Sequence, residues 1–410
     1  EAAWNTWVAQ RDAEIRDRLT RGDEDSIVNF LLFGTTFTRQ PRATPHDIAK
    51  LGDRANVSEI LAGRIEDMVA GIAAPGTNER LQFARQVVER RGIDPSTAAG
   101  KDQVRAYLVE TLRRVLAEID SFRKTIQSAK LLGDPSAVFA ERSTLYRERG
   151  LSSDTSIYPD FALEQSLDEI RAKGLLAAGS VRRVAIVGPG LDFTDKGEGY
   201  DFYPQQTIQP FAVIDSLMRL GLAKPDALTV TTYDLSPRIN QHLAAARERA
   251  RAGTPYVVQL PRDTETNWEQ PLIKYWERFG DRIGVDVKTP APVVGIESVR
   301  MRAIRIRPAI VLSITPQDLN VVLQRPEGLA PGDRYDLIIA TNILVYYDVF
   351  EQSLALVNVS KMLRPGGFLL SNNALFELPS TPMRSAGYTT AVYSDKPDDG
   401  DHIVWYQRQP

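Results

Sequence analysis

The chain has 410 residues, of which 43% are hydrophobic and 25% are charged, and its formal net charge is −3. This length favours two domains, and the small net charge gives no general attraction to nucleic acid or to an anionic membrane. The sequence contains no cysteine and only three widely separated histidines, which excludes disulfides and thiolate chemistry and argues against a histidine-rich metal site. We expect no bound metal.

Apolar runs are too short to span a bilayer, which takes about 20 residues, so we expect no membrane span. Residue 1 is Glu rather than Met. We expect a cytoplasmic protein, although the missing initiator leaves open that a signal peptide has been removed.

The first 150 residues are predicted to form an all-α domain. In Lys101–Leu132, apolar residues recur every three or four positions and form one stripe along about eight helical turns. Gly133 would end this helix. The other predicted helices are Ala3–Arg21, Val57–Ala73, Asn78–Arg91 and Ala137–Arg149.

Residues 151–410 show strands alternating with helices, which is typical of a mostly parallel sheet covered on both faces. The predicted helices start at Asp160, which would act as a cap, and continue with Pro210–Leu220, Ser236–Ala252 and Tyr347–Leu363. The predicted strands are Val184–Val187, Leu228–Tyr233, Ala309–Ile314, Tyr335–Thr341, Gly367–Ser371, Thr389–Tyr393 and His402–Gln407. No helix separates the last two strands, so they should form an antiparallel hairpin at one edge of the sheet.

Residues 254–307 interrupt this alternation and are interpreted as an insertion. Arginines alternate along one of its predicted strands, at positions 300, 302 and 305, with Arg307 just beyond. Such spacing is typical of a solvated strand face, and the alternative is a clamp for an acidic substrate or partner.

The stretch "VRRVAIVGPGLDF" (181–193) is a buried strand that runs into Gly188, Pro189 and Gly190. Glycine at the end of such a strand lets a ligand approach the backbone closely, although a plain tight loop would look the same. A dinucleotide fingerprint would have a third glycine where this chain has Phe193. Asp192 would repel a pyrophosphate but would tolerate a cationic cofactor.

Acidic residues follow the next two predicted strands. Asp234 could accept hydrogen bonds from both ribose hydroxyls of an adenosine, or it could cap the helix that begins at Ser236. Asp318 could accept from an adenine amino group while Leu319 packs on the ring, or it could cap a short helix. Asn342 follows a further buried strand, where a polar amide needs hydrogen-bond partners.

The order of these features resembles that of class I S-adenosylmethionine-dependent methyltransferases over about residues 180–410. Gly-x-Gly follows the first strand, acids follow the second and third, "YDLIIATNIL" (335–344) forms the fourth, and "LRPGGFLL" (363–370) enters the fifth. The stretch from "ATNILVYYD" to "LRPGGFLL" is similar to chemotaxis-receptor methyltransferases. The resemblance implies an α/β fold: a seven-stranded, mostly parallel Rossmann-like sheet with a C-terminal antiparallel hairpin.

The resemblance also implies that S-adenosylmethionine is the cofactor and that an unidentified acceptor receives its methyl group. The turn Gly188, Pro189 and Gly190 would lie under its methionine end, with Asp192 nearby. Asp234 would bind the ribose, Leu235 beside it would also contact the cofactor, and Asp318 and Leu319 would bind the adenine. Thr341 and Asn342 would flank the sulfonium and methyl group.

No catalytic residue is predicted, because methyl transfer needs a base only when the acceptor must lose a proton. The candidate bases, each with an alternative role in packing or substrate shaping, are Tyr200, Tyr203, Tyr346, Tyr347 and Glu377. The long segment 194–210 would be either a lid over the site or a surface excursion.

Two other functions stay open. The chain could bind S-adenosylmethionine or S-adenosylhomocysteine without turnover, or it could be an NAD-dependent oxidoreductase. Phe193 at the third glycine position argues against the oxidoreductase.

Overall fold

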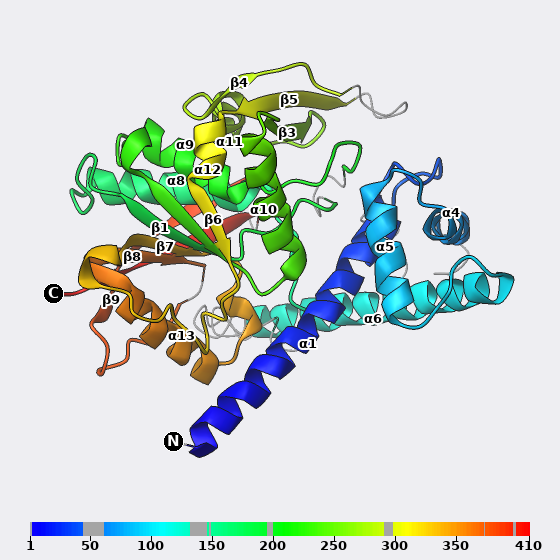
Figure 1. The fold of residues 1–410 in the computed structure, drawn as a ribbon, viewed down its shortest axis with the longest axis horizontal. Coiled ribbons are helices and arrows are strands. Elements are labelled where there is room, and N and C mark those ends of the chain that lie inside the picture. The colour runs from blue at the N-terminus through cyan, green and yellow to red at the C-terminus, as the bar shows by residue number, and fades with distance from the viewer. Residues whose placement is uncertain are drawn as a thin grey trace.

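The computed structural model describes residues 2–43, 61–131, 146, 149–194, 200–290, 298–372, 374–396 and 399–410 (Figure 1). The predicted helix 137–149 falls almost entirely outside these ranges, as do His46 and Asn373. No helix in the described part of the chain combines the length and the apolar character that a membrane crossing needs.

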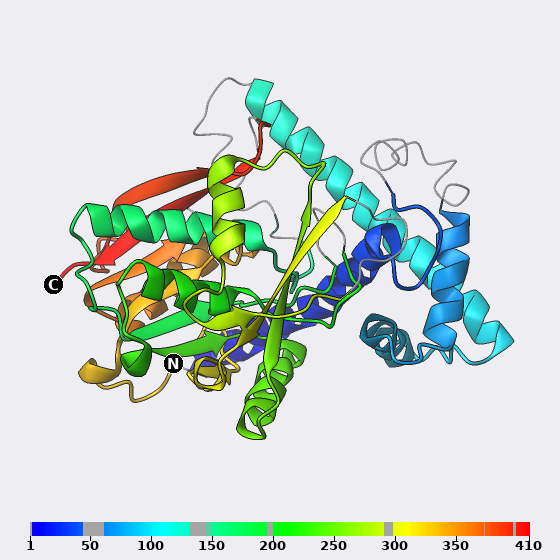
Figure 2. The same ribbon diagram turned by 90° about the horizontal axis from the view of Figure 1, so that it is seen from above.

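The N-terminal region is helical, as predicted. Its helices are α1 (Ala2–Phe33), α4 (Ala62–Ala73), α5 (Glu79–Arg90) and α6 (Ala98–Leu131). α1 continues well past its predicted end, because the apolar residues that follow pack into a core shared by all four helices. From this core α6 runs toward the sheet in both Figure 1 and Figure 2.

Seven strands of the described chain form one sheet in the order β6-β2-β1-β7-β8-β10-β9. Their bounds are β1 (Arg183–Val187), β2 (Thr229–Tyr233), β6 (Ile314–Gln317), β7 (Tyr335–Ala340), β8 (Leu363–Ser371), β9 (Met383–Val392) and β10 (Gly400–Arg408). The first five strands in this order are parallel, and β10 runs antiparallel to both β8 and β9. The structure confirms the predicted sheet and its C-terminal hairpin.

The sheet is buried on both faces, because alternate residues of its strands enter two different apolar clusters. Val184 and Ile186 of β1 face one side, where α8 (Ile157–Ala172), α9 (Gln209–Arg219) and α10 (Pro237–Arg251) pack. Ala185 and Val187 face the other side, which is covered by α13 (Val349–Met362) and by Ile15 of α1. α1 therefore contributes to the sheet's core as well as to the helical core.

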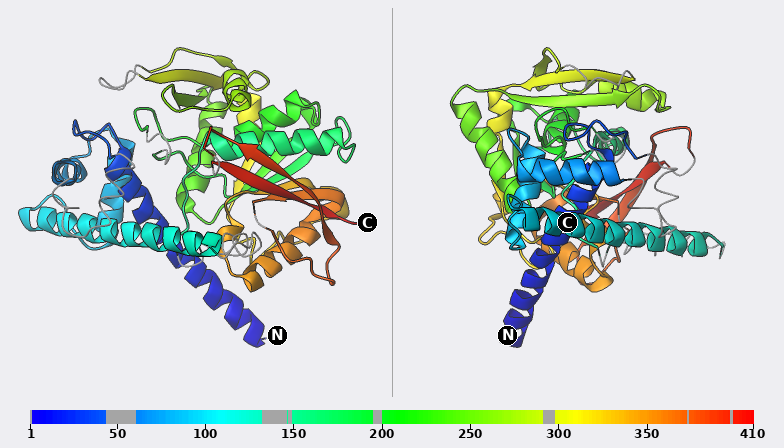
Figure 3. Two further views of the ribbon diagram at one scale, coloured as in Figure 1. Left: turned by 180° about the vertical axis from the view of Figure 1, so that it is seen from behind. Right: turned by 90° about the vertical axis from the view of Figure 1, so that its right-hand side faces the viewer.

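The predicted insertion after α10 forms a small antiparallel sheet in the order β3-β5-β4. Its strands are β3 (Tyr256–Asp263), β4 (Gly284–Asp286) and β5 (Val299–Ile306), and the helix α11 (Gln270–Arg278) lies between β3 and β4 in the chain. Figure 3 shows it at the end of the molecule away from the N-terminus. Arg300 and Arg305 are exposed, whereas Arg302 forms an ion pair with Asp286 at 3.0 Å. The exposed pair fits the interpretation as a solvated strand face.

Two local predictions are wrong. The apolar run predicted as a strand at 309–314 is mostly the helix α12 (Pro308–Leu312), and β6 begins only at Ile314. A short apolar run does not distinguish strand from helix, and Pro308 in the first helical turn favours the helix. Asp160 does not cap α8, because the helix begins at Ile157 and the carboxyl of Asp160 is buried within its first turn.

Candidate functional site

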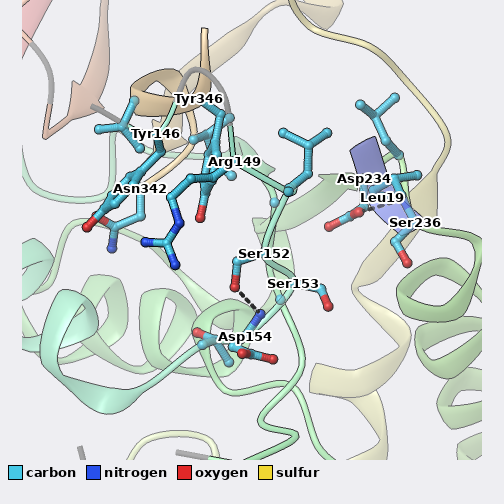
Figure 4. Close-up of a pocket in the computed structure, with 18 of the residues that line it drawn as sticks. Leu19, Tyr146, Arg149, Ser152, Ser153, Asp154, Asp234, Ser236, Asn342 and Tyr346 are labelled. Atoms are coloured by element: carbon cyan, nitrogen blue, oxygen red, sulfur yellow. Dashed lines mark hydrogen bonds between the residues drawn. The ribbon is translucent and has the colours of Figure 1, made fainter. Parts of the chain in front are cut away.

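A cavity of about 540 Å³ lies at the carboxyl ends of β1, β2 and β7, where the strand order reverses. Parallel α/β sheets bind ligands at such a point. Its opposite wall comes from α1, α6 and residues 149–156. Figure 4 shows Asp234, Leu19 and Ser236 at one end of the cavity and Arg149, Tyr346 and Asn342 at the other.

The turn after β1 lines the cavity at Gly188 and Gly190. Both have φ of 68°, which side-chain-bearing residues rarely adopt. A Cβ on Gly188 would lie 2.1 Å from the Cδ1 of Ile343, so a larger residue there would have to displace this side chain as well as adopt the positive φ. Pro189 is not among the lining residues, and its carbonyl accepts a hydrogen bond from Thr207 at 3.4 Å. The turn therefore brings backbone, not side chains, to the cavity.

Asp234 follows β2 and lines the cavity together with Leu235. Its Oδ1 accepts the backbone N–H of Ser236 at 2.8 Å, and the Ser236 side chain makes no capping bond. Asp234 therefore supports the start of α10 and also faces the cavity (Figure 4). Burial raises the pKa of Asp234 to about 7, although the Ser236 N–H and the Arg238 guanidinium act in the opposite direction. Within the described ranges this carboxyl forms no ion pair.

The segment after β6 departs from the sequence assignment. Asp318 does not line the cavity; it forms a two-pronged ion pair with Arg16 of α1, at 2.7 and 2.9 Å. Leu319 and Asn320 line the cavity instead. The buried Asn320 amide donates to Asp12 of α1 at 2.7 Å. α1 thus holds this end of the cavity.

Thr341 and Asn342 both line the cavity at the end of β7. Gln209 of α9 donates to the Thr341 hydroxyl at 2.9 Å. Asn342 has φ of 57°, and its backbone N–H donates to the Asn372 side chain at 2.8 Å. Asn342 is the only non-glycine residue with positive φ in the described ranges, a conformation that Asn tolerates better than most side-chain-bearing residues.

Asp192 and Phe193 do not reach the cavity. The buried Asp192 carboxylate accepts from the Tyr203 hydroxyl and the Gln206 amide, both at 2.9 Å. Phe193 is fully buried against Phe83, with ring centroids 5.2 Å apart. Phe193, which occupies the third glycine position of the dinucleotide fingerprint, instead packs the loop after β1 against the helical core.

The segment predicted as a lid or a surface excursion is anchored where it is described. Tyr200 and Gln206 are buried, and residues 195–199 lie outside the described ranges. Whether the segment acts as a lid stays a prediction.

Sequence reasoning missed the residues that precede α8. Asp154 lines the cavity beside Gly190, and its carboxylate accepts from Ser26 at 2.8 Å and from Asn29 at 3.1 Å, both on α1. A short bridge to Leu191 fixes its backbone. The only sequence signal is the polar run "SSDTS" (152–156), which follows no secondary-structure period.

The far end of the cavity is formed by Tyr146, Arg149 and Tyr346, which sequence reasoning either omitted or named only as a possible base. Arg18 of α1 donates to the backbone carbonyls of all three residues, at 2.8 to 3.1 Å. Tyr347 also lines the cavity. One half-buried guanidinium on α1 therefore holds two segments that are distant from each other in the sequence, one with Tyr146 and Arg149 and one with Tyr346.

The candidate bases are poorly suited to accept a proton here. Burial raises the pKa of Tyr346 to about 12 and raises that of Tyr347 further. Tyr200, Tyr203 and Glu377 do not line the cavity. Among the residues that the structure describes, no group of three or more His, Asp or Glu side chains is placed to hold a metal ion.

No protein-family model matches this sequence, and a search of curated proteins finds no match. Comparison with solved structures finds similar folds. One is the N-methyltransferase NodS from Bradyrhizobium japonicum WM9, with 13% identity, 60% of this chain and 96% of that chain covered, and a TM-score of 0.28. Another is the magnesium protoporphyrin IX methyltransferase from Synechocystis PCC 6803 with bound SAM, with 11% identity, 61% and 79% covered, and a TM-score of 0.29.

A third is the CcbJ methyltransferase from Streptomyces caelestis, with 14% identity, 62% and 78% covered, and a TM-score of 0.24. All three solved structures are methyltransferases, and the second contains bound SAM. TM-scores this low carry no argument about the function of this chain.

Proposed function

We propose that this chain is an S-adenosylmethionine-dependent methyltransferase. The observation that carries the proposal is the convergence of the Gly188–Gly190 turn, the Asp234 carboxyl and Asn342 on one cavity. Both glycines of the turn have positive φ and close neighbours, and Asp234 is a buried acid that forms no ion pair with any described residue. The glycine turn fits the amino-acid end of S-adenosylmethionine, and the Asp234 carboxyl fits its ribose.

Different residues of the cavity would bind different parts of the cofactor. Asp234 accepts from the ribose hydroxyls, and Leu319 packs on the adenine beside Asn320. We assign the cofactor's amino group to Asp154 rather than to Asp192, because Asp154 lines the cavity beside Gly190. Thr341 and Asn342 flank the sulfonium, and the Gln209 hydrogen bond to Thr341 fixes one of these side chains.

When bound, the cofactor supplies an activated methyl group that an in-line displacement can transfer. The protein's part is to align the acceptor and to exclude water, which its wall of helices favours. The raised pKa of Tyr346 and Tyr347 makes neither a useful base near neutral pH. We therefore assign no catalytic base.

We also propose that residues 1–150 form a helical domain that covers the cofactor and shapes the acceptor pocket, with 151–410 as the methyltransferase domain. α1 supports this role, since it contacts lining residues at both ends of the cavity: Asp12 accepts from Asn320 at one end, and Arg18 donates to Tyr346 at the other. The similarity to chemotaxis-receptor methyltransferases remains a resemblance of sequence alone.

Isothermal titration calorimetry tests the proposal directly. S-adenosylhomocysteine should bind the wild-type protein, and NAD should not. With S-adenosylmethionine carrying a tritiated methyl group, label should then appear on some component of a cell extract. Binding without transfer would favour a non-catalytic binding protein, and heat with NAD alone would favour an oxidoreductase. No heat with S-adenosylhomocysteine would refute the assignment.

A further inference from the structure

We infer that the methyl acceptor is a small carboxylate-bearing molecule with an aromatic or planar body, and that Arg149 binds its carboxylate. This inference rests on the proposed function. It concerns the end of the cavity formed by Tyr146, Arg149 and Tyr346, to which the proposed function assigns no part of the cofactor.

The size of the cavity limits the acceptor. A volume of about 540 Å³ lies within the range of about 300 to 1,000 Å³ that holds one drug-sized ligand. The cofactor is itself such a ligand, and α1, α6 and residues 149–156 close the side opposite the sheet. Little room is left for the acceptor, so a side chain presented by a folded protein is a poor fit.

The charges that line the far end differ in how well they are already satisfied. Asp25 accepts from Arg114 at 2.7 Å, and Asp154 accepts from two donors on α1. The closest approach of Arg149 to Glu118 is that of its Nε, at 3.4 Å, which is longer than a usual charge-assisted hydrogen bond. Among the described cavity residues, Arg149 therefore has the most side-chain N–H groups without an acceptor. The planar guanidinium presents these groups in the geometry that a carboxylate accepts.

The surroundings of Arg149 are aromatic and fixed. Its guanidinium carbon lies 5.2 Å from the centre of the Tyr146 ring, and the Tyr146 and Tyr346 rings are 5.5 Å apart. In Figure 4 the guanidinium extends into the open part of the cavity, on the side of Asn342. Arg18 holds the backbone of all three residues, so the binding geometry exists before the ligand arrives. Aromatic walls around a cation favour a planar acid.

A carboxylate at Arg149 could also come from the methionine end of the cofactor. Ligands with and without a carboxylate distinguish these two sources. The cofactor's carboxylate is present in S-adenosylhomocysteine and absent from 5′-methylthioadenosine, whereas an acceptor carboxylate can be supplied separately by benzoate, with benzamide as its uncharged match.

The test uses the full chain saturated with S-adenosylhomocysteine and titrates benzoate and benzamide by calorimetry. Benzoate should bind wild type at least about tenfold more tightly than benzamide, as expected for a charge-assisted pair. Arg149→Gln should remove this preference, and Arg149→Lys should keep part of it. Arg113→Gln, an equal change of charge at an exposed position of α6, should leave it unchanged. The affinity for S-adenosylhomocysteine should stay within about threefold in all variants.

Two results would overturn the inference while leaving the proposed function intact. One is an equal affinity of wild type for benzoate and benzamide. The other is a loss of about tenfold or more in S-adenosylhomocysteine affinity in Arg149→Gln with unchanged 5′-methylthioadenosine affinity, which would give Arg149 to the cofactor. Failure of wild type to bind S-adenosylhomocysteine would instead refute the proposed function, and the inference with it.

Discussion

Replacing Asp234 by Asn should make the protein more stable above neutral pH and at the same time weaken its binding of the cofactor. Asn keeps an oxygen that can accept the N–H of Ser236, so the start of α10 is preserved. It removes a charge that burial disfavours. Stability and binding therefore change in opposite directions at one site, which a purely structural role would not produce.

The magnitude follows from the pKa of Asp234, which is about 7 in the folded chain and 3.8 when unperturbed. Between these values the folded state holds the proton and the unfolded state has lost it, so wild type loses stability as pH rises. The loss is about 1.4 kcal/mol per pH unit, and it reaches about 4 kcal/mol above pH 7, where it levels off. Asn does not titrate, so its advantage should grow over the same interval.

Binding shows the opposite effect. The ionised carboxylate would accept from two ribose hydroxyls, whereas an amide has no charge and only one acceptor oxygen, so S-adenosylhomocysteine should bind Asp234→Asn about 10- to 100-fold more weakly at pH 8. Wild-type affinity should itself fall as pH drops below 7, because Asp234 becomes protonated. Arg238 and Asp318 are the charged neighbours that oppose each other at this carboxyl.

Urea denaturation at pH 5 and pH 8 measures the stability difference, and calorimetry at the same two pH values measures the affinity. Asp234→Glu, which keeps the charge but lengthens the side chain, is the control. If Asp234→Asn were no more stable than wild type at pH 8, relative to pH 5, the carboxyl would not be the destabilising buried acid described here. Unchanged affinity would remove Asp234 from the cofactor site.

Phe193→Ala should lower the free energy of unfolding by about 3 to 5 kcal/mol, because it empties a fully buried site between the sheet and the helices; a loss under about 1 kcal/mol in urea titrations would contradict that packing. Asp318→Asn should change S-adenosylhomocysteine affinity by less than about threefold, since its carboxylate is bound to Arg16 outside the cavity, and a tenfold loss by calorimetry would restore the adenine-binding assignment. Asn342→Val should cost about 1 to 2 kcal/mol through its positive φ, while Asn342→Gly should not, and equal melting temperatures for the two variants would argue against backbone strain.

The sequence alone predicted the sheet and most of its strands, because these depend on local patterns. Buried parallel strands are continuous apolar runs, and the hairpin follows from two strands without a helix between them. The Gly188–Gly190 turn and Asp234 were found for the same reason, since the end of a strand fixes where its next residues lie. The one strand predicted wrongly, at 309–314, is a run too short for its period to distinguish strand from helix.

Tertiary structure decided which side chains reach the cavity. Asp192 and Asp318 satisfied the local pattern, but partners elsewhere in the chain bind both carboxylates outside the cavity: Tyr203 and Gln206 for the first, Arg16 for the second. Asp154 and Arg149 satisfied no pattern and line it.

α1 is the clearest case. Its residues contact Asp318, Tyr346 and Asp154, which lie more than 100 positions away in the sequence. Such contacts depend on how two separately formed cores pack together, and helical or strand periodicity, which reports only which face of an element is apolar, contains no information about that packing.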